Sequence, residues 1–437
     1  MALPLIVLIV CFILLMALNV PIAFCIGAAA LSAVVAVGGP EVGGPPPLLT
    51  IAQQMATGFD SFALLAIPFF ILSGMLMGRG GIARRLVDAA NVFVGSFRGG
   101  LAYVNIMTCM LFGSISGSAT AAVSAVGGFM VPVMNKMGYH RDFNASVSIT
   151  AGTTGLLIPP SNVMIVYSLA TGGSVSISAI FIAGVLPGVL VGLALMVVDG
   201  IISRRRGYGK GQSMPLGEAV KRCLAAIPCL LLIIIVLGGI LKGYFTATEA
   251  SAVAVVYALL LSMVFYREVR IRDLPGIFLQ CGVVTAVIML LIATSMSMSW
   301  ILAYENIPQD ISEFLLGLTD NKFVILLIIN VLLLAVGTFM DMTPAILIFT
   351  PILLPVVKQM GMHPIHFGIV IIMNLCIGLC TPPVGTCLFV GCGVAETSMT
   401  KILKHLIPFF LAMIVILLLT TFVPGIALVL PRYFNLL

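Results

Sequence analysis

The sequence predicts an all-α integral membrane fold made of two inverted repeats, each with a re-entrant hairpin and a helix broken by prolines. The first observation is composition: of 437 residues, 61% are hydrophobic and 8% are charged, whereas soluble domains carry about 25% charged residues. The second is a duplication, since Pro132–Pro160 aligns without a gap on Pro355–Pro383 with 11 identical residues. Both copies end in Pro-Pro, and repeats interrupted in this way are typical of proteins with a binding site at the membrane midplane.

Apolar stretches of about 20 residues are long enough to cross a bilayer, and here they leave no soluble domain. The nine expected crossings cover residues 4–37, 48–78, 143–171, 178–203, 224–241, 246–266, 275–300, 366–394 and 402–430. Two further apolar stretches, 100–135 and 323–357, have glycine, serine or a charge at their centres. We expect both to be re-entrant hairpins, whose tips must lie against protein or water because lipid offers no hydrogen bonds.

The basic residues predict the orientation. With the N-terminus in the cytoplasm, 17 of the 21 Lys and Arg residues fall in cytoplasmic loops, and the exceptions are Lys242, Lys322, Lys358 and Arg432. This bias follows the positive-inside rule and predicts a cytoplasmic N-terminus and a C-terminus on the outer side of the membrane. The apolar N-terminus lacks a charged start, so we expect a retained first span rather than a cleaved signal.

One linking span, 224–241, relates the two halves of the chain. Residues 4–203 and 246–430 each hold four expected crossings and one hairpin, so a single span between them turns the second half upside down. The segments 79–98 and 305–322 precede the hairpins and are mildly amphipathic. We expect them to be arm helices along the membrane surface, although ordinary loops with a helical turn fit the sequence as well.

Each hairpin tip carries polar residues in an apolar context. The first reads GSISGSAT (113–120), whose hydroxyls, together with carbonyls freed at a helix break, are hard oxygen ligands for a small cation. The second reads GTFMDMTP (337–344) and contains Asp341, a carboxylate that is costly at this depth unless it pairs, binds a cation or meets water. Close helix packing of small residues and a polar cap at Asp341 are the structural alternatives.

The Pro-Pro pairs interrupt two expected crossings, at GLLIPPSN (155–162) and GLCTPPVG (378–385). Proline lacks an N–H and frees the carbonyl four residues earlier, and carbonyls freed at mid-membrane can coordinate sodium. Proline kinks also occur in membrane helices without a functional role, but two adjacent prolines duplicated at matching depth favour a binding role.

The remaining reactive residue types form no enzyme signature. Cys376 and Cys380 share a helical face and could suit a metal, yet buried small apolar side chains are the commoner role of cysteine. We expect His140 and His363, which the repeat aligns, to cap helices, and His366 and His405 to be isolated near helix ends. No Ser-His-Asp set, HExxH or P-loop occurs. Interrupted, duplicated segments are typical of transporters, and a transporter without a P-loop would use an ion gradient or run downhill rather than hydrolyse ATP.

The two tips and two breaks, in this order along the chain, resemble the DctM-type large membrane subunit of tripartite ATP-independent periplasmic (TRAP) transporters. The resemblance covers nearly the whole chain, and it implies the cytoplasmic (inner) membrane of a bacterium or archaeon, with the N-terminus in the cytoplasm and the C-terminus in the periplasm. It implies an elevator-type transporter that imports a small organic anion, a carboxylate or sulfonate, coupled to at least two Na⁺ ions and without an organic cofactor. It also implies two partners, a periplasmic substrate-binding protein and a separate small four-helix membrane subunit of the Q type.

The same resemblance implies site residues by motif. One sodium site would use Ser114, Ser116, Gly155, Ile158 and Pro160, and its inverted copy would use Gly337, Met340, Gly378, Thr381 and Val384. Tip support or coupling would come from Thr120, Asp341 and Thr343. From the expected geometry, in which substrate lies between the two tips, we infer that it would lie near Ser118, Ser161, Asn162, Thr343 and Thr386. The implied transport domain comprises residues 100–171 and 323–394, and the implied scaffold comprises 1–99, 172–322 and 395–437.

Some features depart from the resemblance. Thr120 stands where we expect an acidic residue in many relatives, and the insert Gly38–Pro47 has no assigned role. The breaks contain no arginine or lysine, so we expect helix ends, hydroxyls and sodium to hold the anion. The rival interpretations are a sodium/dicarboxylate symporter that needs no binding protein, a membrane-embedded enzyme, for which Asp341 lacks a catalytic partner, and a passive channel.

Overall fold

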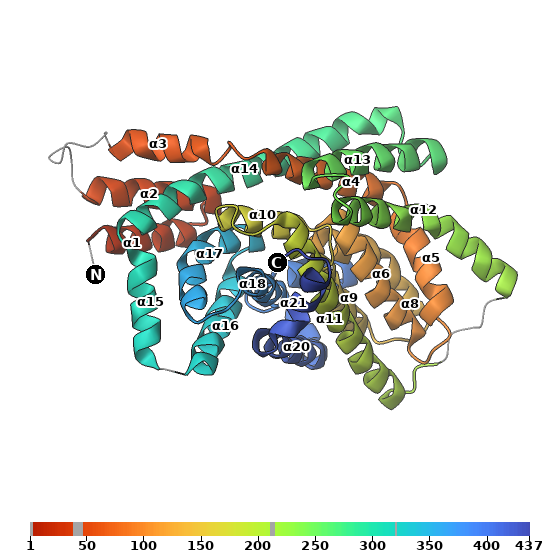
Figure 1. Cartoon of the computed structure of the whole chain (residues 1–437). Helices are drawn as coiled ribbons and strands as arrows, with labels where there is room; N and C mark the ends of the chain where they lie inside the picture. Colours follow the sequence, from red (N-terminus) through yellow and green to blue (C-terminus); the bar gives the residue numbers. More distant parts are fainter. Residues whose placement is uncertain (1–2, 38–46, 210–214, 320) are drawn as a thin grey trace.

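The computed structural model describes residues 3–37, 47–209, 215–319 and 321–437, and Figure 1 shows its helices. Those of the first half are α1 (Leu3–Ala17), α2 (Ile22–Val37), α3 (Pro47–Thr57), α4 (Ala66–Arg79), α5 (Ile82–Val94), α6 (Gly100–Ser116), α7 (Ala119–Ala122), α8 (Gly128–Lys136), α9 (Arg141–Thr154), α10 (Asn162–Ala170) and α11 (Ile177–Arg205). Those of the second half are α12 (Leu216–Leu241), α13 (Ala247–Leu259), α14 (Leu274–Tyr304), α15 (Ile307–Leu318), α16 (Lys322–Phe339), α17 (Met342–Gln359), α18 (Pro364–Gly378), α19 (Thr386–Ala395), α20 (Met399–Phe422) and α21 (Pro424–Tyr433).

The all-helical, multi-pass prediction is confirmed. Within the described ranges, eight helical stretches are long and apolar enough to cross a membrane, or nine if α9 and α10, bent by 51° at their break, count as one span. The segments expected to be arm helices are helical as α5 and α15. The insert expected at 38–47 lies, apart from Pro47, outside the described residues.

The expected single crossing over 4–37 is wrong, because α1 and α2 pack side by side as a helical hairpin. The sulfur of Cys11 lies 3.5 Å from the hydroxyl of Ser32, whereas 21 residues of continuous helix would separate them by about 31 Å. The turn is made by Asn19, whose φ of 61° is left-handed, and Pro21. The chain therefore reverses its direction once more before residue 38 than the expected single crossing allows.

The expected crossing over 402–430 is also not one helix. Helix α20 ends at Phe422, because Pro424 cannot donate a hydrogen bond to continue it, and α21 then packs against α11 and α18. Only α20 is long enough to cross a membrane.

Both expected hairpins double back. In the first, which joins α6 to α7 and α8, the side-chain amide of Asn105 lies 4.0 Å from the sulfur of Met134. In the second, which joins α16 to α17, the Lys322 ammonium donates to the carbonyl of Met360 at 2.8 Å. The base of each hairpin is thus closed, and the loops 117–118 and 340–341 form the opposite ends.

Both expected breaks are present at the proline pairs. The break between α9 and α10 and the break between α18 and α19 each contain a cis Pro-Pro peptide bond, Pro159-Pro160 and Pro382-Pro383. Each helix ends there because two adjacent prolines supply no N–H for the ladder.

The two copies exchange their second half-helices. Helix α19 packs on α9 of the first copy, and α10 packs on α17 of the second. Arg141 and Pro364, which the repeat aligns, each hold the half-helix of the other copy. Arg141 donates to the carbonyl of Ala395 and pairs with Glu396 at 2.7 Å. The carbonyl of Pro364 accepts a 2.6 Å hydrogen bond from Tyr167. Each copy is therefore completed by the other.

The helices fall into two groups by their packing. Helix α14 lies along α2, α3 and α4 (Figure 1), and α13 packs between α4 and α12. The hairpins and broken helices form the second group, and α11, α20 and α21 pack with them. Hydrogen bonds inside this group include His366 Nε2 to the Thr420 carbonyl at 2.7 Å, so His366 is buried rather than isolated at a helix end.

Candidate functional site

Each hairpin tip touches the broken helix of its own copy through two glycines. A Cβ added to Gly113 would lie 2.9 Å from the Cα of Gly155, and one added to Gly337 would lie 3.1 Å from the Cα of Gly378. No side chain fits between the two backbones at either contact. The paired glycines therefore let the main chains of tip and break come into direct contact in both copies.

The two breaks turn in the same way. The carbonyl of Gly155 accepts a 3.3 Å hydrogen bond from the Ile158 amide, and the carbonyl of Gly378 accepts a 2.9 Å bond from the Thr381 amide. The offset between these pairs is the 223 residues of the sequence repeat. Ser114 is fully buried beside the first contact, and its hydroxyl donates to the Leu111 carbonyl at 2.8 Å, which leaves its oxygen free to accept.

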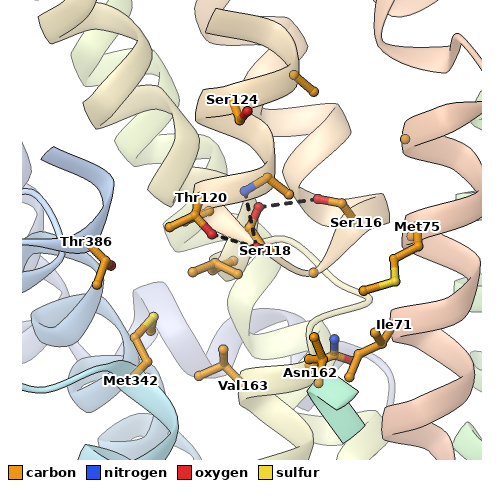
Figure 2. A pocket seen from close by; sticks show the side chains of 18 of the residues that line it. Ile71, Met75, Ser116, Ser118, Thr120, Ser124, Asn162, Val163, Met342 and Thr386 are labelled. Atoms are coloured by element: carbon orange, nitrogen blue, oxygen red, sulfur yellow. Dashed lines mark hydrogen bonds between the residues drawn. The ribbon is translucent and has the colours of Figure 1, made fainter. Parts of the chain in front are cut away.

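The first tip is ordered by its own hydroxyls (Figure 2). Ser118 caps α7 by accepting from the Ala121 amide at 3.3 Å, and its hydroxyl lies 3.1 Å from that of Thr120. The hydroxyl of Ser116 donates to the Ser118 carbonyl at 3.4 Å. At the second tip, Asp341 is the residue before α17, and its side chain makes no capping bond, so the structural alternative of a cap at Asp341 is not supported.

A cavity of about 800 Å³ lies between the two groups of helices and joins both tips and both breaks. Its polar lining from the expected set is Ser116, Ser118, Thr120, Asn162, Asp341, Thr343 and Thr386. Figure 2 shows Thr386 and Met342 of the second copy facing Ser118 and Thr120 of the first. Four of the five expected substrate residues therefore meet in one space, and the exception is Ser161, which is buried behind it.

Three buried polar atoms next to the breaks have no hydrogen-bond partner in the structure. They are the hydroxyl oxygen of Ser161, the side-chain carbonyl oxygen of Asn162 and the hydroxyl oxygen of Thr386. An unpaired buried polar group costs about 1–3 kcal/mol, so a ligand that pairs with these oxygens would be stabilised here. All three are oxygens, the donor type that sodium takes, and the residues present therefore fit the implied ion.

Most other expected sodium ligands lie around the glycine contacts rather than in the cavity lining. Ser114 and Gly155 are buried there, Gly378 is buried at the second contact, and Val384 is 40% exposed. Ser114 would contribute its hydroxyl oxygen and the other three residues their main-chain carbonyls, and the structure neither adds nor removes a residue from that set.

The sequence analysis missed a basic side chain in the cavity. Arg79, at the end of α4, lines it and donates to the Gln280 side-chain oxygen of α14 at 2.8 Å. Arg79 takes part in none of the ion pairs formed by the described residues. The statement that helix ends, hydroxyls and sodium alone would meet the anion is therefore incomplete. The signal was present as a charge at the end of a span, but only packing shows which arginine faces the cavity.

Comparison with protein families gives a match over nearly the whole chain. The family described as "Tripartite ATP-independent periplasmic transporter, DctM component" matches residues 9–426. The chain is 47% identical to the "Uncharacterized protein YgiK" of Salmonella typhimurium, over 99% of this chain and 98% of that protein. It is 41% identical to the "C4-dicarboxylate TRAP transporter large permease protein DctM" of Pseudomonas aeruginosa, over 90% and 91%.

A third relative joins two subunits in one chain. The "Isethionate TRAP transporter permease protein DctMQ" of Oleidesulfovibrio alaskensis is 41% identical over 99% of this chain and 66% of its own length. Among solved structures, the Alcanivorax borkumensis YdaH transporter matches with a TM-score of 0.64 at 13% identity, over 99% of this chain and 98% of that one. At that identity the likeness supports the fold alone.

Proposed function

The chain belongs to the DctM component family of tripartite ATP-independent periplasmic transporters, and we propose that it imports a small organic anion together with sodium by an elevator movement. Its family consists of transporter permeases, not enzymes. The observation that carries the proposal is the cavity in which two hairpin tips, two broken helices and a second group of helices meet. Such a space offers one binding site to two bodies that can slide past each other.

Sodium would bind where each tip touches its break. The glycine contacts put main-chain oxygens beside Ser114 and beside Gly337, and the unpartnered oxygens of Ser161 and Thr386 lie next to the proline pairs. Asp341 faces the cavity and would either complete the second site or couple it to the first. Two symmetric sites would then need two ions per cycle, as the duplicated motif suggests.

The moving body in this proposal is larger than the two hairpins and broken helices. Helices α11, α20 and α21 pack on that group through contacts such as the 3.4 Å bond from the Ser146 hydroxyl to the Ile402 carbonyl. We therefore assign residues 177–205 and 399–433 to the transport domain, and α1–α4 with α12–α14 to the scaffold. The arm helices α5 and α15 would join the two bodies.

The hairpin of α1 and α2 changes the proposed orientation. With the basic loops kept in the cytoplasm, the added reversal puts the N-terminus on the periplasmic side, together with the C-terminus, in place of the cytoplasmic N-terminus expected above. The cavity reaches Arg79, which lies just before the first turn of α5 with Arg84 and Arg85. In this orientation the cavity faces the cytoplasm, the state from which substrate is released.

Two partners and a substrate class follow from the relatives. Members of the family work with a periplasmic binding protein and a small membrane subunit, and the fused relative combines the large and small subunits in one chain. Relatives are named for C4-dicarboxylates and for isethionate, so we propose a small carboxylate or sulfonate for this chain. Arg79 would meet the anionic group at the scaffold wall.

Reconstitution into proteoliposomes tests the proposal. The chain and its small subunit are combined with an inward sodium gradient, with and without the binding protein loaded with a radiolabelled organic acid. Uptake that needs both sodium and the binding protein is expected. Sodium-driven uptake without the binding protein would favour the two-component symporter instead. In the same assay, Ser114→Ala with Ser116→Ala, or Asp341→Ala, should weaken sodium dependence, and unchanged dependence would disprove the site assignment.

A further inference from the structure

A cluster of possible metal ligands lies away from the cavity, where α9 begins and α20 begins. His140, Asp142 and His405 each present one ligand atom, and these atoms all lie within 4.8 Å of one another. The two imidazole rings stack with centroids 4.9 Å apart and planes 15° apart. His405 is therefore not an isolated residue, and the transport proposal gives the cluster no role.

On Asp142 and His405, the atoms that would not bind a metal are already held by neighbours. The Thr397 hydroxyl donates to Asp142 Oδ1 at 2.6 Å, while Asp142 Oδ2 lies 3.8 Å from His140 Nδ1. His405 Nδ1 lies 3.4 Å from the Lys401 carbonyl, so its Nε2 remains available. Outer contacts of this kind orient histidine and carboxylate ligands in metal sites.

The surrounding charges act against a cation and so limit which metals fit. The Arg206 guanidinium lies near His405, and Arg141 is paired with Glu396 at 2.7 Å. A hard cation that binds through charge alone would be bound only weakly here, because the cluster has a single carboxylate. Imidazole nitrogen forms strong coordination bonds to zinc and related transition metals, which depend less on net charge.

We propose that His140, Asp142 and His405 bind one divalent transition-metal ion of the zinc class, with water as a fourth ligand. His140 is exposed and can turn its ring toward the ion. The ion would join α9 of the first copy to α20, next to the place where Arg141 holds the end of α19. The site lies on the same side as Arg204–Arg206 at the C-terminal end of α11, because the Tyr208 hydroxyl accepts from the His140 amide at 3.1 Å.

The test uses the full-length chain, purified without a polyhistidine tag and treated with a chelator. One equivalent of Zn²⁺ should bind per chain in calorimetry and raise the thermal unfolding temperature. Co²⁺ should give the visible absorption of a four-coordinate ion that contains nitrogen ligands. In His140→Ala, His405→Ala and the double variant, stoichiometric binding and the absorption should be lost. Thr397→Val, which removes only the outer contact, should weaken binding about 10- to 100-fold.

The control is His363→Asn, which removes a histidine elsewhere and should bind Zn²⁺ like the original chain. Circular dichroism and gel filtration show whether each variant is folded, and Thr397→Val keeps all three ligands if a histidine variant unfolds. Binding that survives in the double variant, or a wild-type chain that binds no more Zn²⁺ than the double variant, would overturn the proposal. Stabilisation by pH alone, with no effect of metal, would indicate only a histidine–aspartate ion pair. These outcomes do not bear on the transport proposal.

Discussion

At the scale of single residues, the cavity holds two opposite fixed charges on different bodies. Asp341 lies at the second hairpin tip, and Arg79 lies at the end of α4 beside Gln280. In the proposed cycle the carboxylate travels with the ions, while the guanidinium stays on the scaffold. The anion would therefore contact Arg79 only when the cavity faces the cytoplasm, as in the arrangement described here.

Replacing Arg79 by glutamine should weaken capture of the anion more than turnover. An exposed charge-assisted contact contributes about 1 kcal/mol, so KM for exchange from the cytoplasmic side should rise about fivefold with little change in kcat. Counterflow measured in proteoliposomes gives both constants. Arg79→Lys should lie between, and Arg84→Gln, which alters an arginine outside the cavity lining, should leave KM unchanged. Equal effects of the two glutamine variants would argue against a cavity role.

His363 gives a prediction for pH. Its Nδ1 accepts from the Ile365 amide at 3.2 Å and caps α18, as the sequence suggested. Burial, and then the nearby Arg432, lower the pKa of His363. A depressed pKa means that the neutral ring stabilises the fold above about pH 6.5, and this contribution is lost as pH falls through the lower folded pKa.

The unfolding temperature should therefore drop between pH 7 and pH 5, and His363→Asn should reduce that drop, because asparagine can accept the same bond without titrating. Thermal unfolding of both chains across this range is the measurement. His363→Ala, with no cap, should lose about 1 kcal/mol at pH 7. Identical pH profiles for the original and the asparagine chain would show that His363 is not the group responsible.

At the scale of elements, the glycine contacts decide how closely hairpin and broken helix approach. A Cβ on Gly378 would lie within about 2.5 Å of the Gly337 backbone, and one on Gly155 would meet the backbone of Gly113. Backbone cannot move aside as a flexible side chain can. Any side chain here would push the tip away from the carbonyls that the proposed sodium sites need.

Gly155→Ala and Gly378→Ala should each destabilise the protein by about 1–3 kcal/mol, the usual cost of overpacking, and should abolish sodium-driven uptake. Gly128→Ala is the matched control, because a Cβ there has no atom within 4 Å, and alanine in a helix is favoured over glycine by up to about 1 kcal/mol. Thermal unfolding and uptake are measured for all three. Full uptake by either contact variant would contradict the tight approach.

Local sequence predicted the elements whose chemistry is local. Two adjacent prolines interrupt a helix when they fall in its interior, so the breaks at 159–160 and 382–383 could be placed, and clustered hydroxyls marked the first tip. Asn19 and Pro21 loosen the expected crossing over 4–37 but do not predict a reversal there, because hydropathy runs evenly through them and a left-handed asparagine has no periodic signal. Arg79 and the pairing of His140 with His405 depend on packing between distant segments, which periodicity cannot reveal.

At the scale of the whole molecule, the two bodies meet closely at one point of α4. A Cβ on Gly74 would lie 2.7 Å from the Ser116 carbonyl oxygen, so the first tip rests directly on the scaffold. If the tip slides during transport, this contact exists only in the arrangement described here. A larger residue at Gly74 would then disfavour this arrangement relative to the other.

Gly74→Val should shift the population toward the state that faces the opposite side. A reporter cysteine at Thr120, in a background without other reactive cysteines, should label more slowly with an impermeant maleimide from the cytoplasmic side. Gly78→Ala, whose Cβ would make an ordinary 3.6 Å contact with Phe112, should label at the original rate. Unchanged labelling of the valine variant would mean that the tip does not leave α4.

The exchange of half-helices sets an order of assembly during synthesis. The first break is complete only when α19 lies against α9 and when Pro364 reaches Tyr167, and both partners leave the ribosome more than 190 residues after the segments they cover. Since synthesis proceeds at about 5–20 residues per second, the polar first copy remains without these packing partners for on the order of 10 seconds or more. During that interval the insertion machinery, rather than the nascent protein, must shield its hydroxyls from lipid.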